Sequence, residues 1–325
     1  MSTQTFTERV WRRLCGLGID AFLNGAALAG RLSPRSWGVT HHVEVQRDLS
    51  YQATGKVEHR FDLYRPQRAQ APLPIVLYVH GGGFRILSKD THYVMALAFA
   101  RAGYLVLNIN YRLAPRHRYP AALEDVAAAY AWTHANAAGL GGDPARLVVA
   151  GESAGANLAL ALAIACCYEH DEPVAREIFR QGRVPAAVWA GCGMLQVSNP
   201  GRFFPTAPRF FWERTEEIAR TYLPAGDDLE QARDDLVDPL LYLERAGQPA
   251  RPLPPVFASV GGNDPLQDDT LRLQRALAKL GGQVEARVYG REPHAFQAFV
   301  WRPEARRCWQ DSFAFLQAVL TTTPR

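Results

Sequence analysis

The sequence is poor in the features that mark disulfide-bonded, membrane-spanning and nucleic-acid-binding proteins. It has 5 cysteines in 325 residues, without a C-x-x-C pair, which favours idle thiols in a reducing compartment over a disulfide framework or a zinc site. No stretch of about 18 uninterrupted apolar residues occurs, so we expect no membrane span. The formal net charge of +4 is spread along the chain and gives no reason to expect a nucleic-acid partner.

The N-terminal segment carries two patterns that mimic other functions. Residues 8–30 combine basic residues with an apolar stretch, but Asp20 and Asn24 interrupt it, so we expect an amphipathic helix rather than a signal peptide, and a cytoplasmic protein. The "GLGIDA" of residues 16–21 follows a helical pattern instead of a strand, which argues against a dinucleotide site.

The rest of the chain alternates short apolar runs with longer helical patterns. Two opening strands, 43–49 and 59–66, alternate apolar and polar residues and are predicted to be antiparallel. Nearly continuous apolar strands follow at 74–80, 104–111, 146–152, 186–192, 255–262 and 284–290. Helical patterns occupy 91–103, 120–137, 155–170 and 268–282. This order predicts an α/β fold, a mostly parallel sheet with crossover helices.

Two segments do not fit that alternation. Residues 1–45 are mostly helical in pattern, and the insertion at about 195–235 is rich in aromatic residues and proline. We expect both to cover the sheet of a catalytic domain that spans residues 46–325. Whether the insertion is a lid or a structural hydrophobic cluster stays open.

Ser153 lies between Gly151 and Gly155, where a strand pattern gives way to a helical one. A serine that presents its hydroxyl on a tight strand-to-helix turn needs small neighbours on both sides. The "HGGGF" of residues 80–84 follows another strand. The backbone N–H groups of Gly82, Gly83 and Ala154 can converge on one oxygen and stabilise an oxyanion.

A serine nucleophile also requires a base and an acid that orients the base. Asp264 directly follows one late strand, and His294 lies in the loop after the next, which is the order of an α/β-hydrolase triad. Asp268 and Asp269 remain alternatives for the acid. A turn or helix-capping role for Asp264 also remains open.

Taken together, the chain resembles the hormone-sensitive-lipase-like carboxylesterases, bacterial family IV of the α/β-hydrolase fold. The resemblance runs from about residue 60 to the C-terminus and rests on five segments in order: "HGGGF", "NYRLAPRHRYPAALED", "GESAGANLA", "NDPLQDD" and "PHAF". It implies Ser153 as nucleophile, Asp264 and His294 as its partners, and an oxyanion hole of Gly82, Gly83 and Ala154. His80 is then a scaffold for the glycine loop.

The resemblance also implies a helical cap and an apolar pocket for short to medium acyl esters. Candidate pocket residues are Phe84, Phe203, Phe204, Phe211 and Trp212. The chain departs from the family at Arg85, Arg116 and Ala295. Arg85 is either a surface residue or a pocket residue that favours an acidic group. Glu152 is a candidate for a hydrogen bond to the glycine loop.

The predicted activity is that of a serine carboxylesterase that uses an acyl-enzyme and needs neither a cofactor nor a metal. An amidase, formamidase or lactonase on the same residues is the alternative among enzymes, because the pocket selects the leaving group. A ligand receptor without catalysis is the alternative outside enzymes. The predicted partner is a small ester substrate, and a homodimer stays open.

Overall fold

The computed structural model describes residues 41–68, 70, 72–204, 207–231 and 235–322. The expected N-terminal helical segment therefore lies almost entirely outside the described residues. Its last residues, from Val43, begin the first strand.

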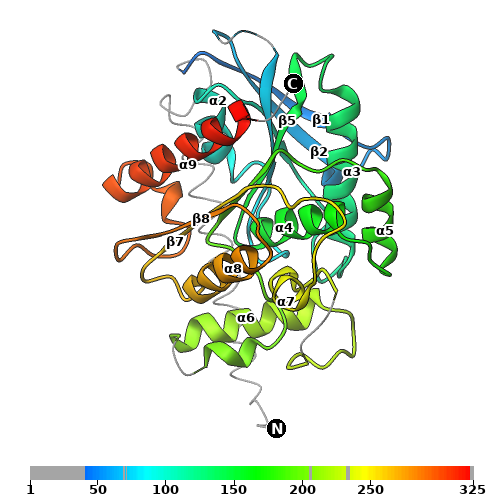
Figure 1. The fold of residues 1–325 in the computed structure, drawn as a ribbon, viewed down its shortest axis with the longest axis vertical. Coiled ribbons are helices and arrows are strands. Elements are labelled where there is room, and N and C mark those ends of the chain that lie inside the picture. The colour runs from blue at the N-terminus through cyan, green and yellow to red at the C-terminus, as the bar shows by residue number, and fades with distance from the viewer. Residues whose placement is uncertain (1–40, 69, 71, 205–206, 232–234, 323–325) are drawn as a thin grey trace.

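The described chain folds around one mostly parallel sheet of eight strands (Figure 1). Their order across the sheet is β1-β2-β4-β3-β5-β6-β7-β8. The strand β1 pairs antiparallel with β2, and β2 pairs antiparallel with β4, whereas the remaining neighbours are parallel. The strands are β1 Val43–Ser50, β2 Arg60–Pro66, β3 Leu73–Val79, β4 Leu105–Ile109, β5 Gly142–Glu152, β6 Ala187–Gly191, β7 Val256–Gly261 and β8 Val284–Tyr289. This confirms the predicted fold class.

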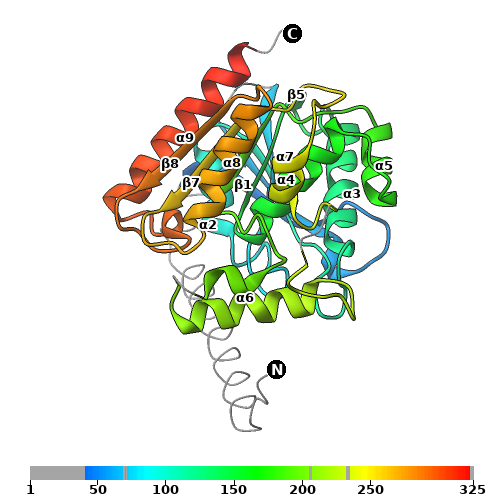
Figure 2. The same ribbon diagram turned by 60° about the horizontal axis from the view of Figure 1, so that its bottom comes forward.

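Helices occupy both faces of the sheet and its carboxyl end. They are α2 Tyr93–Arg101, α3 Ala121–Asn136, α4 Ala154–Cys167, α5 Pro173–Arg180, α6 Arg209–Tyr222, α7 Pro239–Arg245, α8 Gln267–Lys279 and α9 Pro303–Thr322, with short 3-10 turns η3 Val57–His59, η4 Pro200–Phe203 and η5 Phe296–Ala298. In both views α6 runs below the sheet, across one end of the molecule (Figures 1 and 2).

The sheet is buried on both faces, which explains why its inner strands are apolar at nearly every position. Along β3, Ile75 and Leu77 join the core cluster that includes residues of α3, α4 and α8, whereas Val76 and Tyr78 join the cluster that includes residues of α2 and α9. Successive side chains of a strand point to opposite faces. The strands thus present their carboxyl ends, rather than their faces, to a ligand.

Candidate active site

Ser153 occupies a strained turn between β5 and α4. Its backbone lies at φ 52° and ψ −116°, a region that L-residues seldom adopt and that costs on the order of 1–3 kcal/mol. A Cβ on Gly151 would lie 2.3 Å from the Gly155 carbonyl oxygen, and one on Gly155 would lie 2.1 Å from that of Val79. Both glycines are therefore required by the close approach of backbone segments that forms this turn.

The glycine loop of residues 80–84 lies directly beside the serine. A Cβ placed on Gly81 would lie 3.4 Å from the Ser153 Cβ, and Gly82 has a φ of 110°. Within the described residues, the N–H groups of Gly82, Gly83 and Ala154 donate to no protein acceptor. They are available to bind a developing oxyanion, and Ala154 adds the positive end of the α4 dipole.

His294 and Asp264 form the charged pair of the site. The Asp264 carboxylate Oδ2 lies 2.8 Å from His294 Nδ1, and its side chain is wholly buried while that of His294 is 34% exposed. Burial lowers the pKa of His294, but the neighbouring Cys192 sulfur and the Asp264 carboxylate raise it by more, so that this pKa lies well above its usual value.

Neither alternative acid contacts this histidine. Asp268 is exposed and lies 3.7 Å from Arg275. Asp269 is buried and accepts hydrogen bonds from the backbone of Leu195 and from Arg202. Asp264 is thus the carboxylate that the fold brings to His294.

The structure places Ser153, Asp264 and His294 after β5, β7 and β8, at one end of the sheet. The backbone N–H of Ser153 donates to the Gly191 carbonyl at 2.9 Å, and Gly191 precedes Cys192, whose sulfur lies within 4.8 Å of a His294 ring nitrogen. Among the described residues, no hydrogen bond joins the Ser153 hydroxyl to His294. Such bonds often form only when substrate binds. We call these three residues, with the glycine loop, the strand-end site.

Glu152 links the strand-end site to two residues that the sequence did not single out. Its Oε1 lies 2.8 Å from His92 Nε2, and its Oε2 accepts a hydrogen bond of 2.7 Å from Gln297 Nε2. Burial raises the pKa of Glu152, but the hydrogen bonds from His92 and Gln297 and the charges of His92 and His294 together lower it by more, so the pKa lies below its usual value. His92 Nε2 is also 3.3 Å from the Gly81 nitrogen. The His92 ring thus lies between the Glu152 carboxylate and Gly81, and the Glu152 backbone packs directly on Gly81, where an added Cβ would lie 3.0 Å from the Glu152 carbonyl oxygen.

His80, the first residue of the glycine loop, holds the Gly81 backbone in place through its ring. Its ring stacks on Tyr111 with centroids 4.2 Å apart, and its Nδ1 lies 2.7 Å from the Gly81 carbonyl oxygen. Burial lowers the pKa of His80 to about 3. The ring is therefore neutral at neutral pH and can donate Nδ1–H to that carbonyl.

The α6 helix packs on the glycine loop, and we call it the cover. A Cβ on Gly83 would lie 2.6 Å from Ile218 Cδ1. Phe84 stacks on Tyr222 with ring centroids 3.8 Å apart and is wholly buried by this contact. Arg85 pairs with Glu217 at 2.9 Å. The residue that stood out as a departure thus holds the cover by an ion pair.

The segment before α3 also reaches the cover. The Tyr119 N–H donates to the Tyr222 carbonyl at 2.9 Å, and Arg118 Nη1 donates to that of Arg220 at 2.9 Å. No side chain caps the N-terminus of α3. The Asp125 carboxylate, one turn into the helix, points back to the preceding loop and accepts hydrogen bonds from the Arg112 backbone N–H and Nε.

The other predicted pocket aromatics lie in and before the cover. Phe203 is 5% exposed and packs edge-on against Phe211, whereas Phe204 is 66% exposed and packs against Trp212. Phe211 and Trp212 are partly buried against the main core.

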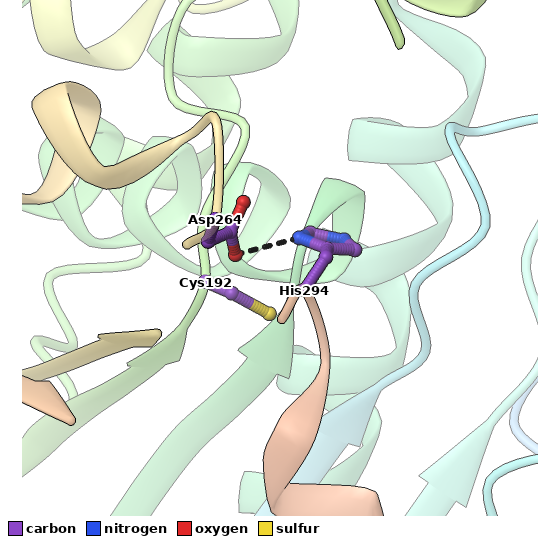
Figure 3. A group of neighbouring side chains, drawn as sticks. All are labelled: Cys192, Asp264 and His294. Carbon is purple, nitrogen blue, oxygen red and sulfur yellow. Dashed lines mark hydrogen bonds and ion pairs between the residues drawn. The ribbon is translucent and has the colours of Figure 1, made fainter. Parts of the chain in front are cut away.

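Cys192 is the third functional group that the sequence did not single out. It follows β6, and with His294 and Asp264 it forms a group whose ligand atoms lie within 4.8 Å of one another, close enough to hold a metal ion (Figure 3). The available signal was its position directly after a buried strand, which it shares with the predicted site residues.

No helix among the described residues has the length and apolar character needed to cross a membrane.

The chain is similar to known esterases over most of its length. A family model described as alpha/beta hydrolase fold matches residues 76–298. The chain is 33% identical over 243 residues to carboxylesterase NlhH of Mycobacterium tuberculosis, covering 74% of this chain and 71% of that one. It is 32% identical over 241 residues to an acetyl esterase of Salmonella schwarzengrund, covering 72% and 68%. The solved structure of esterase LipW from Mycobacterium marinum superposes with a TM-score of 0.73 at 27% identity, covering 93% of this chain and 89% of that one.

Proposed function

The chain belongs to the α/β-hydrolase fold family, within the hormone-sensitive-lipase-like carboxylesterases, and from this premise we propose that Ser153, His294 and Asp264 carry out its ester hydrolysis. The observation that carries the proposal is the 2.8 Å bond between His294 and a wholly buried Asp264, at the sheet end where a strained turn presents Ser153. These are the nucleophile, base and orienting acid of acyl transfer.

In the acylation half, Ser153 Oγ attacks the ester carbonyl while His294 Nε2 takes its proton. Asp264 accepts Nδ1–H, which leaves the lone pair on Nε2, and it stabilises the imidazolium that forms. The N–H groups of Gly82, Gly83 and Ala154 bind the oxyanion. Each such donor contributes about 3–4 kcal/mol to transition-state stabilisation.

The acylation half ends as the ester carbon–oxygen bond breaks and His294 gives its proton to the departing alcohol, which leaves the acyl-enzyme. Water then attacks the acyl-enzyme, with His294 as base again, and the acid leaves as Ser153 regains its proton. Glu152, held by His92 and Gln297, sits behind the serine as a positioning residue for this turn and for Gly81.

The proposed substrates are esters with short to medium acyl chains. The close approach of the cover to Gly83, with Ile218 against the glycine loop, supports a limited space above the serine. Phe211 and Trp212, which are partly buried, are the better candidates for contacts with an apolar acyl or alcohol group. The ring of Phe84 is stacked on Tyr222, so that face is not open to a substrate.

A p-nitrophenyl ester series from acetate to laurate tests both parts of the proposal. We expect turnover of the short esters, and a loss of about 10⁶-fold in kcat for Ser153→Ala. Ser50→Ala, which changes an exposed serine at the end of β1, is the matched control and should keep full activity. Equal rates for Ser153→Ala and wild type would reject the nucleophile. Inactivity of folded wild type on all esters, with turnover of amides or lactones, would favour those substrates.

A further inference from the structure

Cys192 is a buried thiol that ester hydrolysis does not use, and it lies against the two residues that activate the serine. One ligand atom from each of Cys192, Asp264 and His294 lies within 4.8 Å of the others. Figure 3 shows the thiol and the carboxylate converging on the same ring from separate strand ends.

The backbone around Cys192 holds its thiol in this position. The residue has a left-handed φ of 39°, its N–H donates to the Ser259 carbonyl at 2.6 Å, and the side chain is fully buried. Its sulfur also lies 3.5 Å from Gln297 Nε2, the amide that binds Glu152. A strained backbone and a fixed sulfur mean that the group is preorganised rather than a chance encounter of mobile side chains.

A thiolate, an imidazole and a carboxylate form a ligand set for zinc and its softer relative cadmium. Zinc binds such atoms at about 2.0–2.3 Å in tetrahedral geometry and leaves a fourth position for water when the protein supplies three ligands. The two anionic ligands balance the charge of a divalent cation in a largely buried place. The 34% exposure of the His294 side chain gives the cation a route from solvent.

We propose that Cys192, Asp264 and His294 bind one zinc-class divalent cation, and that this cation reversibly inhibits the esterase. The inhibitory part rests on the proposed function of His294. Nδ1 is the ring nitrogen that faces Asp264, so it is the one that binds the cation. The ring hydrogen then resides on Nε2, which can no longer accept the proton of Ser153. The thiol proton leaves to solvent as the sulfur–metal bond forms.

Cadmium titration of the metal-free full chain tests the site without ester turnover. Thiolate ligation is followed by its charge-transfer absorbance, and stoichiometry by calorimetry. We expect one cadmium ion per chain in wild type, and loss of the absorbance with more than about 100-fold weaker binding in Cys192→Ser, since even outer ligand partners contribute up to that factor. Cys192→Ala serves as the second variant if the serine hydroxyl disturbs folding.

Two controls separate this proposal from the proposed function. Cys308→Ser removes another buried cysteine and should bind cadmium like wild type. Ser153→Ala should also bind it like wild type, even though it hydrolyses no ester. In wild type, zinc should abolish ester hydrolysis and a chelator should restore it. Equal cadmium binding by wild type and Cys192→Ser, or loss of binding in Cys308→Ser, would overturn the site. Undiminished hydrolysis by the cadmium-bound wild type would overturn the inhibition.

Discussion

The strand-end site and the cover are held in place by different kinds of contact. Ser153, Asp264 and His294 sit on short connections directly after paired strands, so the register of the sheet sets their spacing. Within the part of the chain that the structure describes, the contacts that hold the cover include an aromatic stack, the ion pair of Arg85 with Glu217 and hydrogen bonds from a loop about 100 residues earlier in the sequence. The sheet therefore sets the positions of the reacting groups, whereas individual side-chain contacts set the position of the helix that covers the substrate.

After the loss of Ser153 itself, the largest expected effect comes from breaking the strand-end site at its acid. Asp264→Asn would present an amide donor to Nδ1, favour the wrong ring tautomer and lower kcat by about 10⁴-fold. Asp268→Asn is the matched control: this exposed carboxylate lies in the first turn of α8, just after the loop that carries Asp264. It should leave kcat unchanged. Steady-state kinetics on one short ester measures both. A similar loss in the two variants would contradict the assignment of the acid.

His80 should make the free energy of unfolding depend on pH in the acid range. Its pKa is lowered to about 3 in the folded chain, so the unfolded chain binds more protons between that pH and about 6.5, the ordinary histidine value. Stability is therefore lost as pH falls through this window, by about 3 kcal/mol at pH 4. Denaturant unfolding at several pH values should give a slope smaller by about one proton for His80→Gln. An unchanged slope would contradict this account.

Gly83→Ala tests the contact where the two regions meet. The new Cβ would strike Ile218, which lies at 2.6 Å, and would displace the cover or the donor N–H. We expect kcat to fall by about 10²-fold, the effect of losing one oxyanion donor. Adding Ile218→Ala removes the clashing atoms and should restore part of the rate. A double variant no faster than Gly83→Ala would show that backbone strain at residue 83, and not the cover, causes the loss.

The smallest effect is expected at the ion pair between Arg85 and Glu217. Their side chains are 18% and 40% exposed, so the coupling energy should be only about 0.5 kcal/mol in a double-mutant cycle. Arg85→Met and Glu217→Gln should change KM for longer esters more than kcat for acetate, because the pair holds the cover and not the reacting groups. Equal changes for all chain lengths would argue against that division.

The sequence predicts the strand-end site better than the cover, because the sheet positions the first and separate side-chain contacts position the second. Ser153 and Asp264 each follow a buried apolar stretch of strand, and His294 follows the half-exposed edge strand β8. Parallel strands bring their carboxyl ends to one edge of the sheet whatever path the loops take. The stack of Phe84 on Tyr222 joins residues far apart in sequence, whereas the resemblance implies a pocket position for Phe84. His92 and Cys192 were missed because a lone histidine beside a helix and one thiol among five give no pattern. Their contacts depend on the path of the loops.

The last turn of the cover touches the glycine loop itself, and this links two requirements of the reaction. Phe84, the last residue of that loop, stacks on Tyr222, and Arg118 and Tyr119 donate hydrogen bonds to the carbonyl groups of Arg220 and Tyr222. A substrate group that displaces this turn would therefore displace the loop that carries the oxyanion donors as well. Discrimination by size should then appear in the rate of the chemical step and not only in binding.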